Sequence, residues 1–221
     1  MGNNVKFFEA ISGGDLTRVK SMLDNDPELL TSRDEQGVSP ILAALYHHQR
    51  EVLGELIMRV PKLDIWEASA TGHLLQVEEI LGQDLSLLNA FSPDGFTALG
   101  LAAFFGRKAI LEELVRRGAD VNIPSNNLMR VQALHSAVAH QNTSVAIQMA
   151  RLLLERGAEV NASQTGGWRP LHEAAMRGNI ELIKLLLHWG ADPNAENDEG
   201  KTPLDMAIQS GDENIISLLR G

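Results

Sequence analysis

A short pattern near the C-terminal end of the chain recurs at a fixed distance. Pro170-Leu171 is followed 33 residues later by Pro203-Leu204, and Gly178 is followed at the same distance by Gly211. Self-similarity at a fixed period in this range is the signature of repeat architectures, in which copies of one unit stack in a row. Because one small unit cannot bury its apolar face alone, the period predicts further copies along the chain.

Each unit is predicted to be a pair of helices. Thr202 and Pro203 suit the start of a helix, because threonine caps the first free N–H groups and proline has no N–H that needs a partner. Gly178 ends the short first helix. A second helix over residues 180–188 has apolar side chains at the spacing of one buried face, and Gly190 can adopt the left-handed conformation that ends it.

The same unit can be followed along nearly the whole chain. The residues that end successive first helices are Gly14, His48, Gly72, Gly106, Gln141, Gly178 and Gly211. The intervals between them are 34, 24, 34, 35, 37 and 33 residues, which predicts about seven helix pairs. About four extra residues at 142–146 would add one helical turn to the fifth pair.

The stretch Trp168–Asn194 resembles one ankyrin repeat, a family with a 33-residue period and the signature Thr-Pro-Leu-His-x-Ala. The resemblance implies an all-α repeat fold, an ankyrin-repeat solenoid of about seven helix pairs with short β-hairpin fingers. We expect a flexible N-terminus over residues 1–6 and a single ankyrin-repeat domain over residues 7–221. The expected repeats are approximately 7–37, 38–62, 63–94, 95–127, 128–164, 165–197 and 198–221.

The fingers are expected where turn-forming residues cluster between the pairs, because Asp, Asn, Pro and Gly are the residues that tight turns require. These positions are residues 34–37, 92–95, 126–130, 165–167 and 198–200. The 24-residue interval falls at Val60-Pro61-Lys62 and is about nine residues shorter than the period. We therefore expect this junction to lack its finger and to leave a notch in the row.

The composition excludes several classes of function. A formal net charge of −10 repels phosphate backbones, so no nucleic-acid partner is expected. The chain has no cysteine, which excludes disulfides, thiolate nucleophiles and cysteine zinc sites. It has no apolar run long enough for a signal peptide or a membrane span, which favours a cytoplasmic protein without a membrane partner. No phosphate-binding glycine loop or dinucleotide motif is present, so we expect no cofactor and no catalysis.

The histidines are the remaining candidates for chemistry. His135 and His172 occupy the histidine of the family signature, and the resemblance implies a structural role for them. An alternative function is a small-molecule or metal-dependent enzyme that uses the surface histidines His47, His48 or His140. Adjacent histidines on a helix point in different directions, and no pair has zinc-protease spacing with a nearby carboxylate, so no metal site is expected.

A second alternative is a purely structural array that self-associates through Phe7-Phe8 at its N-terminal end.

In the family, partners contact the last residues of each first helix and the finger tips. Here these positions carry aromatic, methionine and arginine side chains, which are common anchors of interfaces. The resemblance therefore implies a monomeric, non-catalytic protein–protein interaction module that binds a folded protein partner through its concave inner-helix and finger surface. The predicted binding residues are Tyr46, His47, Phe96, Phe104, Phe105, Val131, His140, Trp168, Met176, Arg177 and Lys201. The alternative for Phe104 and Phe105 is that they fill space over Ala70 and Ala139 in adjoining repeats.

Overall fold

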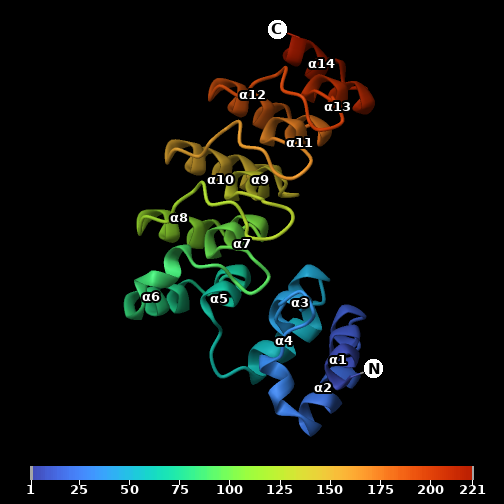
Figure 1. Ribbon diagram of the computed structural model, residues 1–221, viewed down its shortest axis with the longest axis vertical. Coiled ribbons are helices and arrows are strands. Elements are labelled where there is room, and N and C mark those ends of the chain that lie inside the picture. The colour runs from blue at the N-terminus through green and yellow to red at the C-terminus, as the bar shows by residue number, and fades with distance from the viewer. Residues whose placement is uncertain (1, 221) are drawn as a thin grey trace.

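The chain folds into an all-α array. The computed structural model describes residues 2–220, so Met1 of the expected segment 1–6 and Gly221 of the expected domain lie outside the described residues. Within this range the chain forms fourteen α-helices and two 3-10 helices, η1 (Pro27–Thr31) and η2 (Leu85–Asn89). The helices follow one another in contacting pairs, and Figure 1 shows these pairs stacked in single file from the N-terminal to the C-terminal end.

The first helix of each pair contacts the first helices of its neighbours, and together they form a continuous inner row. The inner helices are α1 (Asn3–Ser12), α3 (Pro40–Tyr46), α5 (Ile65–Thr71), α7 (Ala98–Phe104), α9 (Ala133–Val138), α11 (Pro170–Met176) and α13 (Pro203–Ser210). The row is tightly packed because fully buried alanines such as Ala44, Ala102, Ala137 and Ala174 let neighbouring helices approach closely.

The second helices form an outer row in which each packs against the first helix of its pair, and Figure 1 shows this row on one side of the inner helices from the third to the sixth pair. They are α2 (Leu16–Asn25), α4 (Arg50–Arg59), α6 (Leu74–Gln83), α8 (Lys108–Arg116), α10 (Thr143–Glu155), α12 (Ile180–His188) and α14 (Glu213–Arg220). Helix α10 has 13 residues whereas α8 and α12 have 9, so the extra residues expected in the fifth pair do lengthen its outer helix. The outer row is interrupted, because α4 contacts α2 but makes no comparable contact with α6.

Local hydrogen bonds explain where the inner helices start. The Thr97 hydroxyl accepts a bond from the Gly100 N–H at 3.0 Å, as an N-cap should. Helices α9 and α11 lack such a cap because Gln132 and Arg169 replace the usual threonine. There the histidine three residues later takes one half of the capping role, since the Arg169 N–H donates to His172 Nδ1 at 3.2 Å.

The expected β-hairpin fingers are not formed as hairpins. Within residues 2–220 the only strand-like pairing is an isolated bridge between Phe91 and Thr97. At each expected finger the chain instead forms a tight turn, which is closed by a backbone bond such as that from the Ser92 N–H to the Phe96 carbonyl at 2.8 Å. The arms of each turn are too short for a ladder, because the inner helix begins within two residues of the closing bond.

The N-terminal end differs from expectation in two ways. Helix α1 already begins at Asn3, so residues 3–6 of the segment expected to be flexible are helical. Phe7 is fully buried and contacts the half-buried Phe8 edge to face, with ring centroids 6.0 Å apart. Phe7 is therefore part of the core and is not available to a second copy of the chain.

Candidate functional site

The turns between the helix pairs are bonded to one another along the array. The Asn126 N–H donates to the Gly95 carbonyl at 2.7 Å, and the Asp198 N–H donates to the Gly166 carbonyl at 3.0 Å. Glycine is needed at Gly95, because its φ is +89° and an added Cβ would lie 2.8 Å from the Asn126 carbonyl oxygen. The turns therefore form a continuous edge beside the inner helices.

The shortened junction after the second pair lacks a turn but leaves no notch. Helix α4 ends at Arg59 and α5 begins at Ile65, so only residues 60–64 connect them. The flanking turns meet across this position, because a Cβ on Gly37 would lie 2.7 Å from the Pro93 carbonyl oxygen. The expected notch is therefore wrong: without a turn in between, the turn of the second pair packs directly against the turn of the fourth.

The same closure brings three predicted binding residues together. Tyr46 at the end of α3 lies 5.5 Å from Phe105 and 6.1 Å from Phe104, measured between ring centroids. Phe104 and Phe105 contact each other edge to face at 5.0 Å. Helix α5 between them ends in Ala70 and Thr71, which are small enough for rings from the second and fourth pairs to meet over it. We call Tyr46, Phe104 and Phe105 the aromatic cluster.

The aromatic cluster is held by a hydrogen bond and exposes one of its three rings. The Tyr46 hydroxyl donates to Asp94 Oδ2 at 3.0 Å, which ties α3 to the turn before α7. Burial raises the pKa of Tyr46 well above its usual value, and the charge and hydrogen bond of the Asp94 carboxylate raise it further. The hydroxyl therefore stays protonated. Phe104 nevertheless exposes 49% of its surface. The alternative prediction, that these rings only fill space over adjoining repeats, therefore fits the half-buried Phe105 better than it fits Phe104.

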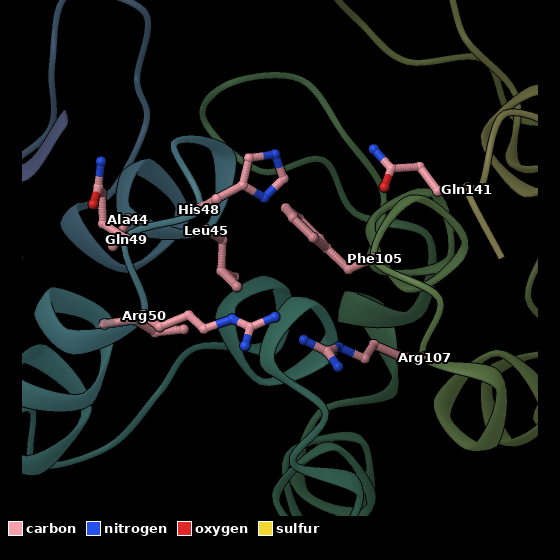
Figure 2. Close-up of a pocket in the computed structure, with 9 residues that line it drawn as sticks. Ala44, Leu45, His48, Gln49, Arg50, Phe105, Arg107 and Gln141 are labelled. Carbon is pink, nitrogen blue, oxygen red and sulfur yellow. The ribbon is translucent and has the colours of Figure 1, made fainter. Parts of the chain in front are cut away.

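A hollow of about 490 Å³ lies beside the aromatic cluster (Figure 2). It opens where the turns from α3 to α4 and from α7 to α8 face each other across the third pair. Its lining residues are Ala44, Leu45, His48, Gln49, Arg50, Leu53, Phe105, Arg107 and Gln141. Figure 2 shows Arg50 and Arg107 extending toward each other from opposite sides, with His48 and Phe105 opposite each other beside them.

The other predicted residues lie along the same row without a recorded contact to the aromatic cluster. His140 lies against the fourth pair, because a Cβ on Gly106 would overlap its ring. Trp168 is half-buried and contacts His172 edge to face at 5.9 Å, and Met176 exposes 47% of its surface. Arg177 forms an ion pair with Glu173.

The remaining predicted positions divide by exposure. His47 and Lys201 are exposed, whereas Phe96 and Val131 are half-buried behind the turns. Phe96 donates its N–H to the Ser92 hydroxyl at 2.9 Å, and Val131 donates its N–H to the Ser125 hydroxyl at 2.8 Å. Phe96 and Val131 therefore belong more to the turn structure than to the exposed surface.

The sequence did not single out Arg50, Arg107 or Asp94. Arg50 and Arg107 each follow the end of an inner helix by a few residues, outside the positions that the family pattern assigns to partners. They line the same hollow because the junction before the third pair is short and α5 ends in small residues. The available signal was the 24-residue interval, which marks the place where non-adjacent pairs come together.

The two signature histidines have the structural role expected of them. His135 Nε2 and His172 Nε2 donate to the carbonyls of Ala162 and Lys201, each at 3.0 Å, and so connect consecutive units. Their Nδ1 atoms accept backbone N–H bonds, which requires the neutral ring. Burial lowers the pKa of both histidines, which favours that neutral form.

Two further properties concern the described part of the chain. Among residues 2–220, no three His, Cys, Asp or Glu side chains are grouped so that they could hold a metal ion. Over the same range, no helix has both the length and the apolar character that a membrane crossing requires.

Stacked helix pairs that are joined by signature histidines and by bonded turns define a helical repeat protein. A family model of ankyrin repeats in three copies matches residues 65–164 and again residues 147–221. The chain belongs to the ankyrin repeat family.

Several characterised proteins are similar to part of the chain. Human ankyrin repeat domain-containing protein 53 is 35% identical over 115 residues, which cover 52% of this chain and 21% of that protein. The NF-kappa-B p105 subunit of Gallus gallus is 28% identical over 180 residues, 74% of this chain and 18% of that protein. The potassium channel AKT1 of Arabidopsis thaliana is 42% identical over 81 residues, 37% of this chain and 9% of that protein. The match thus covers about a fifth or less of each of these relatives.

Proposed function

We propose that the chain is a non-catalytic module that binds a folded protein partner through its inner helices and the adjoining turns, and that it does so as a monomer. Ankyrin repeats are generally protein–protein interaction modules. In this proposal, residues 7–221 form one domain of seven helix pairs. The aromatic cluster lies at the centre of its binding surface.

One observation carries the proposal: large apolar side chains stand exposed on the inner face of an ordered scaffold. Phe104 and Met176 expose 49% and 47% of their surfaces at the ends of α7 and α11. Aromatic side chains held rigidly lose little entropy on binding and are frequent hot spots. Phe104 is held in this way because Tyr46 and Phe105 support its ring.

The partner should contact several pairs at once, because a single pair presents only one or two such side chains. Trp168, Arg177 and Lys201 would extend the surface from the aromatic cluster toward the C-terminal end. Leu128 and Met129, exposed by 92% and 52% in the turn between α8 and α9, would extend it at its edge.

Affinity capture from an extract of cells that naturally contain the protein, followed by binding measurements with the purified partner, tests the proposal. We expect Phe104→Ala combined with Trp168→Ala to weaken partner binding by at least about tenfold, since each truncation removes a candidate hot spot. Leu75→Ala is the matched control, because Leu75 is 81% exposed on the outer helix α6. Equal binding by the wild type and the double variant would rule out this surface.

A further inference from the structure

The hollow beside the aromatic cluster carries positive charge on a strongly acidic chain. The ionisable side chains that line it are His48, Arg50 and Arg107, and no carboxylate of the described residues is among its lining. The chain as a whole has a net charge of −10. A local concentration of positive charge on this acidic chain therefore requires a physical explanation.

Arg107 is held in place by a bond that leaves most of its donors free. Its Nε donates to the Ala70 carbonyl at 2.8 Å, and its terminal nitrogens have no hydrogen bond or ion pair among residues 2–220. Burial also lowers the pKa of Arg107, because it removes water from around the guanidinium group. By contrast, Arg116 and Arg117 at the end of the same helix both pair with Glu113, at 2.7 Å and 2.6 Å.

Arg50 approaches from the other side of the hollow (Figure 2). The Arg50 side chain likewise has no hydrogen bond or ion pair within the described part of the chain, and only the Arg50 backbone N–H is bonded, to the His48 carbonyl at 3.1 Å. Two guanidinium groups that face each other repel, so the arrangement is stabilised when an anion lies between them. A carboxylate suits this position, because guanidinium groups bind it through two parallel hydrogen bonds.

The backbone around the hollow adds to its positive character. Helices α4 and α8 begin at its rim, and neither has a side-chain cap on its N-terminal amides. The corresponding starts of α10 and α12 are capped by Asn142 and Asn179. The N-terminal ends of α4 and α8 thus retain partial positive charge that an anion would balance.

His48 lies in an unusual conformation at the same place. Its φ is +56°, whereas the equivalent residues of other pairs are glycines such as Gly14 and Gly106, with φ of +71° and +68°. A side chain in this region is strained. The His48 ring lines the hollow opposite Phe105, where a glycine would present no side chain (Figure 2).

We propose that this hollow binds a glutamate or aspartate side chain from an extended acidic segment of the protein partner, with the carboxylate held between Arg50 and Arg107. An apolar residue of the same segment would lie against Phe104 and Phe105. The volume of the hollow, about 490 Å³, accommodates a few side chains, and its continuity with the exposed ring of Phe104 favours a peptide over an isolated ion. This inference rests on the proposed function and adds the chemistry of the partner.

Calorimetric titration of the full chain with two short synthetic peptides tests the proposal. One peptide alternates glutamate and phenylalanine, and the other replaces each glutamate with glutamine. We expect the acidic peptide to bind at least about tenfold more tightly than the neutral peptide, because charge-assisted bonds to two guanidinium groups are lost with the carboxylates. Its affinity should fall as salt is added.

Single arginine variants test whether the acidic peptide binds in this hollow. Arg50→Gln should weaken binding of the acidic peptide by about tenfold. Arg50 makes no contact that the fold needs, so the variant should melt like the wild type. Arg151→Gln is the matched control, because Arg151 is an exposed arginine of the outer helix α10. Arg107→Gln should have at least the effect of Arg50→Gln.

Three results would overturn the proposal: equal affinity for the two peptides, equal effects of Arg50→Gln and Arg151→Gln, or displacement of the acidic peptide by an equal concentration of inorganic phosphate. The last result would assign the hollow to a small anion. If the captured protein partner still binds through Phe104 in any of these cases, the interaction function stands and only the acidic specificity fails.

Discussion

At the scale of single residues, the glycines at the turn tips decide how closely successive units can stack. Gly37, Gly95 and Gly167 each have positive φ and face backbone atoms of the next turn. Gly54 and Gly82 have neither property, since they lie within outer helices with nothing near them. The two groups should therefore respond to substitution in opposite ways.

Replacing Gly95 with alanine is expected to destabilise the protein by about 2 kcal/mol or more, because the new Cβ is strained at this φ and meets the Asn126 carbonyl. Gly82→Ala is expected to change the free energy of unfolding by less than about 1 kcal/mol, in the stabilising direction. Urea denaturation of the two variants and the wild type measures both effects. A Gly95→Ala variant as stable as Gly82→Ala would contradict the packing described for the turns.

His172 should make stability depend on pH. Its pKa is lowered by burial in the folded chain, so the unfolded chain binds the proton more tightly and stability is lost as the pH falls below the ordinary histidine pKa of about 6.5. We expect His172→Gln to lose less stability than the wild type between about pH 7 and about pH 5. Burial raises the pKa of Asp64 to about 6, so protonation of Asp64 stabilises the fold as the pH falls through part of this range. This contribution is the same in the wild type and in His172→Gln. Denaturation curves at several pH values measure the difference, and parallel curves would exclude this role for His172.

At the scale of elements, the short connection between α4 and α5 has the largest consequence. Residues 60–64 contain no turn, and α5 ends in small residues, so the second and fourth pairs touch. This contact between the second and fourth pairs allows the hydrogen bond from Tyr46 to Asp94 and the ring contacts of the aromatic cluster. The aromatic cluster is thus a consequence of one missing turn.

Restoring a turn should undo this contact. Inserting a copy of residues 92–97 between Val60 and Pro61 is expected to separate Tyr46 from Asp94, so that the raised pKa of Tyr46 falls toward the ordinary value of about 10. The chain has 1 tyrosine, so phenolate absorbance during alkaline titration reports on this residue alone. The same insertion after Leu128, which is 92% exposed, is the control and should leave the titration unchanged. An unchanged titration in both variants would mean that the junction does not hold the pairs together.

At the scale of the whole molecule, stability is divided among neighbours, because most contacts of a solenoid unit are with the units beside it. The inner row is continuous from α1 to α13. The outer row is broken after α4, which packs on α2 but not comparably on α6. Helices with a neighbour on one side only should open more easily than those with two.

Hydrogen exchange followed by mass spectrometry should show this division. We expect amides of α8 and α10 to exchange slowest among the outer helices, because each has an outer neighbour on both sides. Amides of α4 should exchange faster than those of α8, although both helices are flanked by further pairs. Equal protection of α4 and α8 would show that the interruption of the outer row has no energetic effect.

Much of the local structure could be predicted from the sequence because it depends on residues close together in the chain. Three local features each act over a few residues: the threonine before α13 with the proline at its first position, the glycines after the inner helices, and the apolar spacing of α12. The family and its helix pairs follow from their repetition. The strandless turns were not predicted, because the length of a turn's arms depends on where the next helix starts.

The sequence by itself determined that the chain forms stacked helical hairpins and that one junction is shortened, because period and capping are properties of nearby residues. Only the tertiary structure decided that the gap closes, that Tyr46 reaches Phe105, and that Arg50 faces Arg107 across a hollow. These contacts join residues of the second and fourth pairs, and their formation depends on how far the third pair lets its neighbours approach. That distance is set by side-chain packing around α5, which no local pattern encodes.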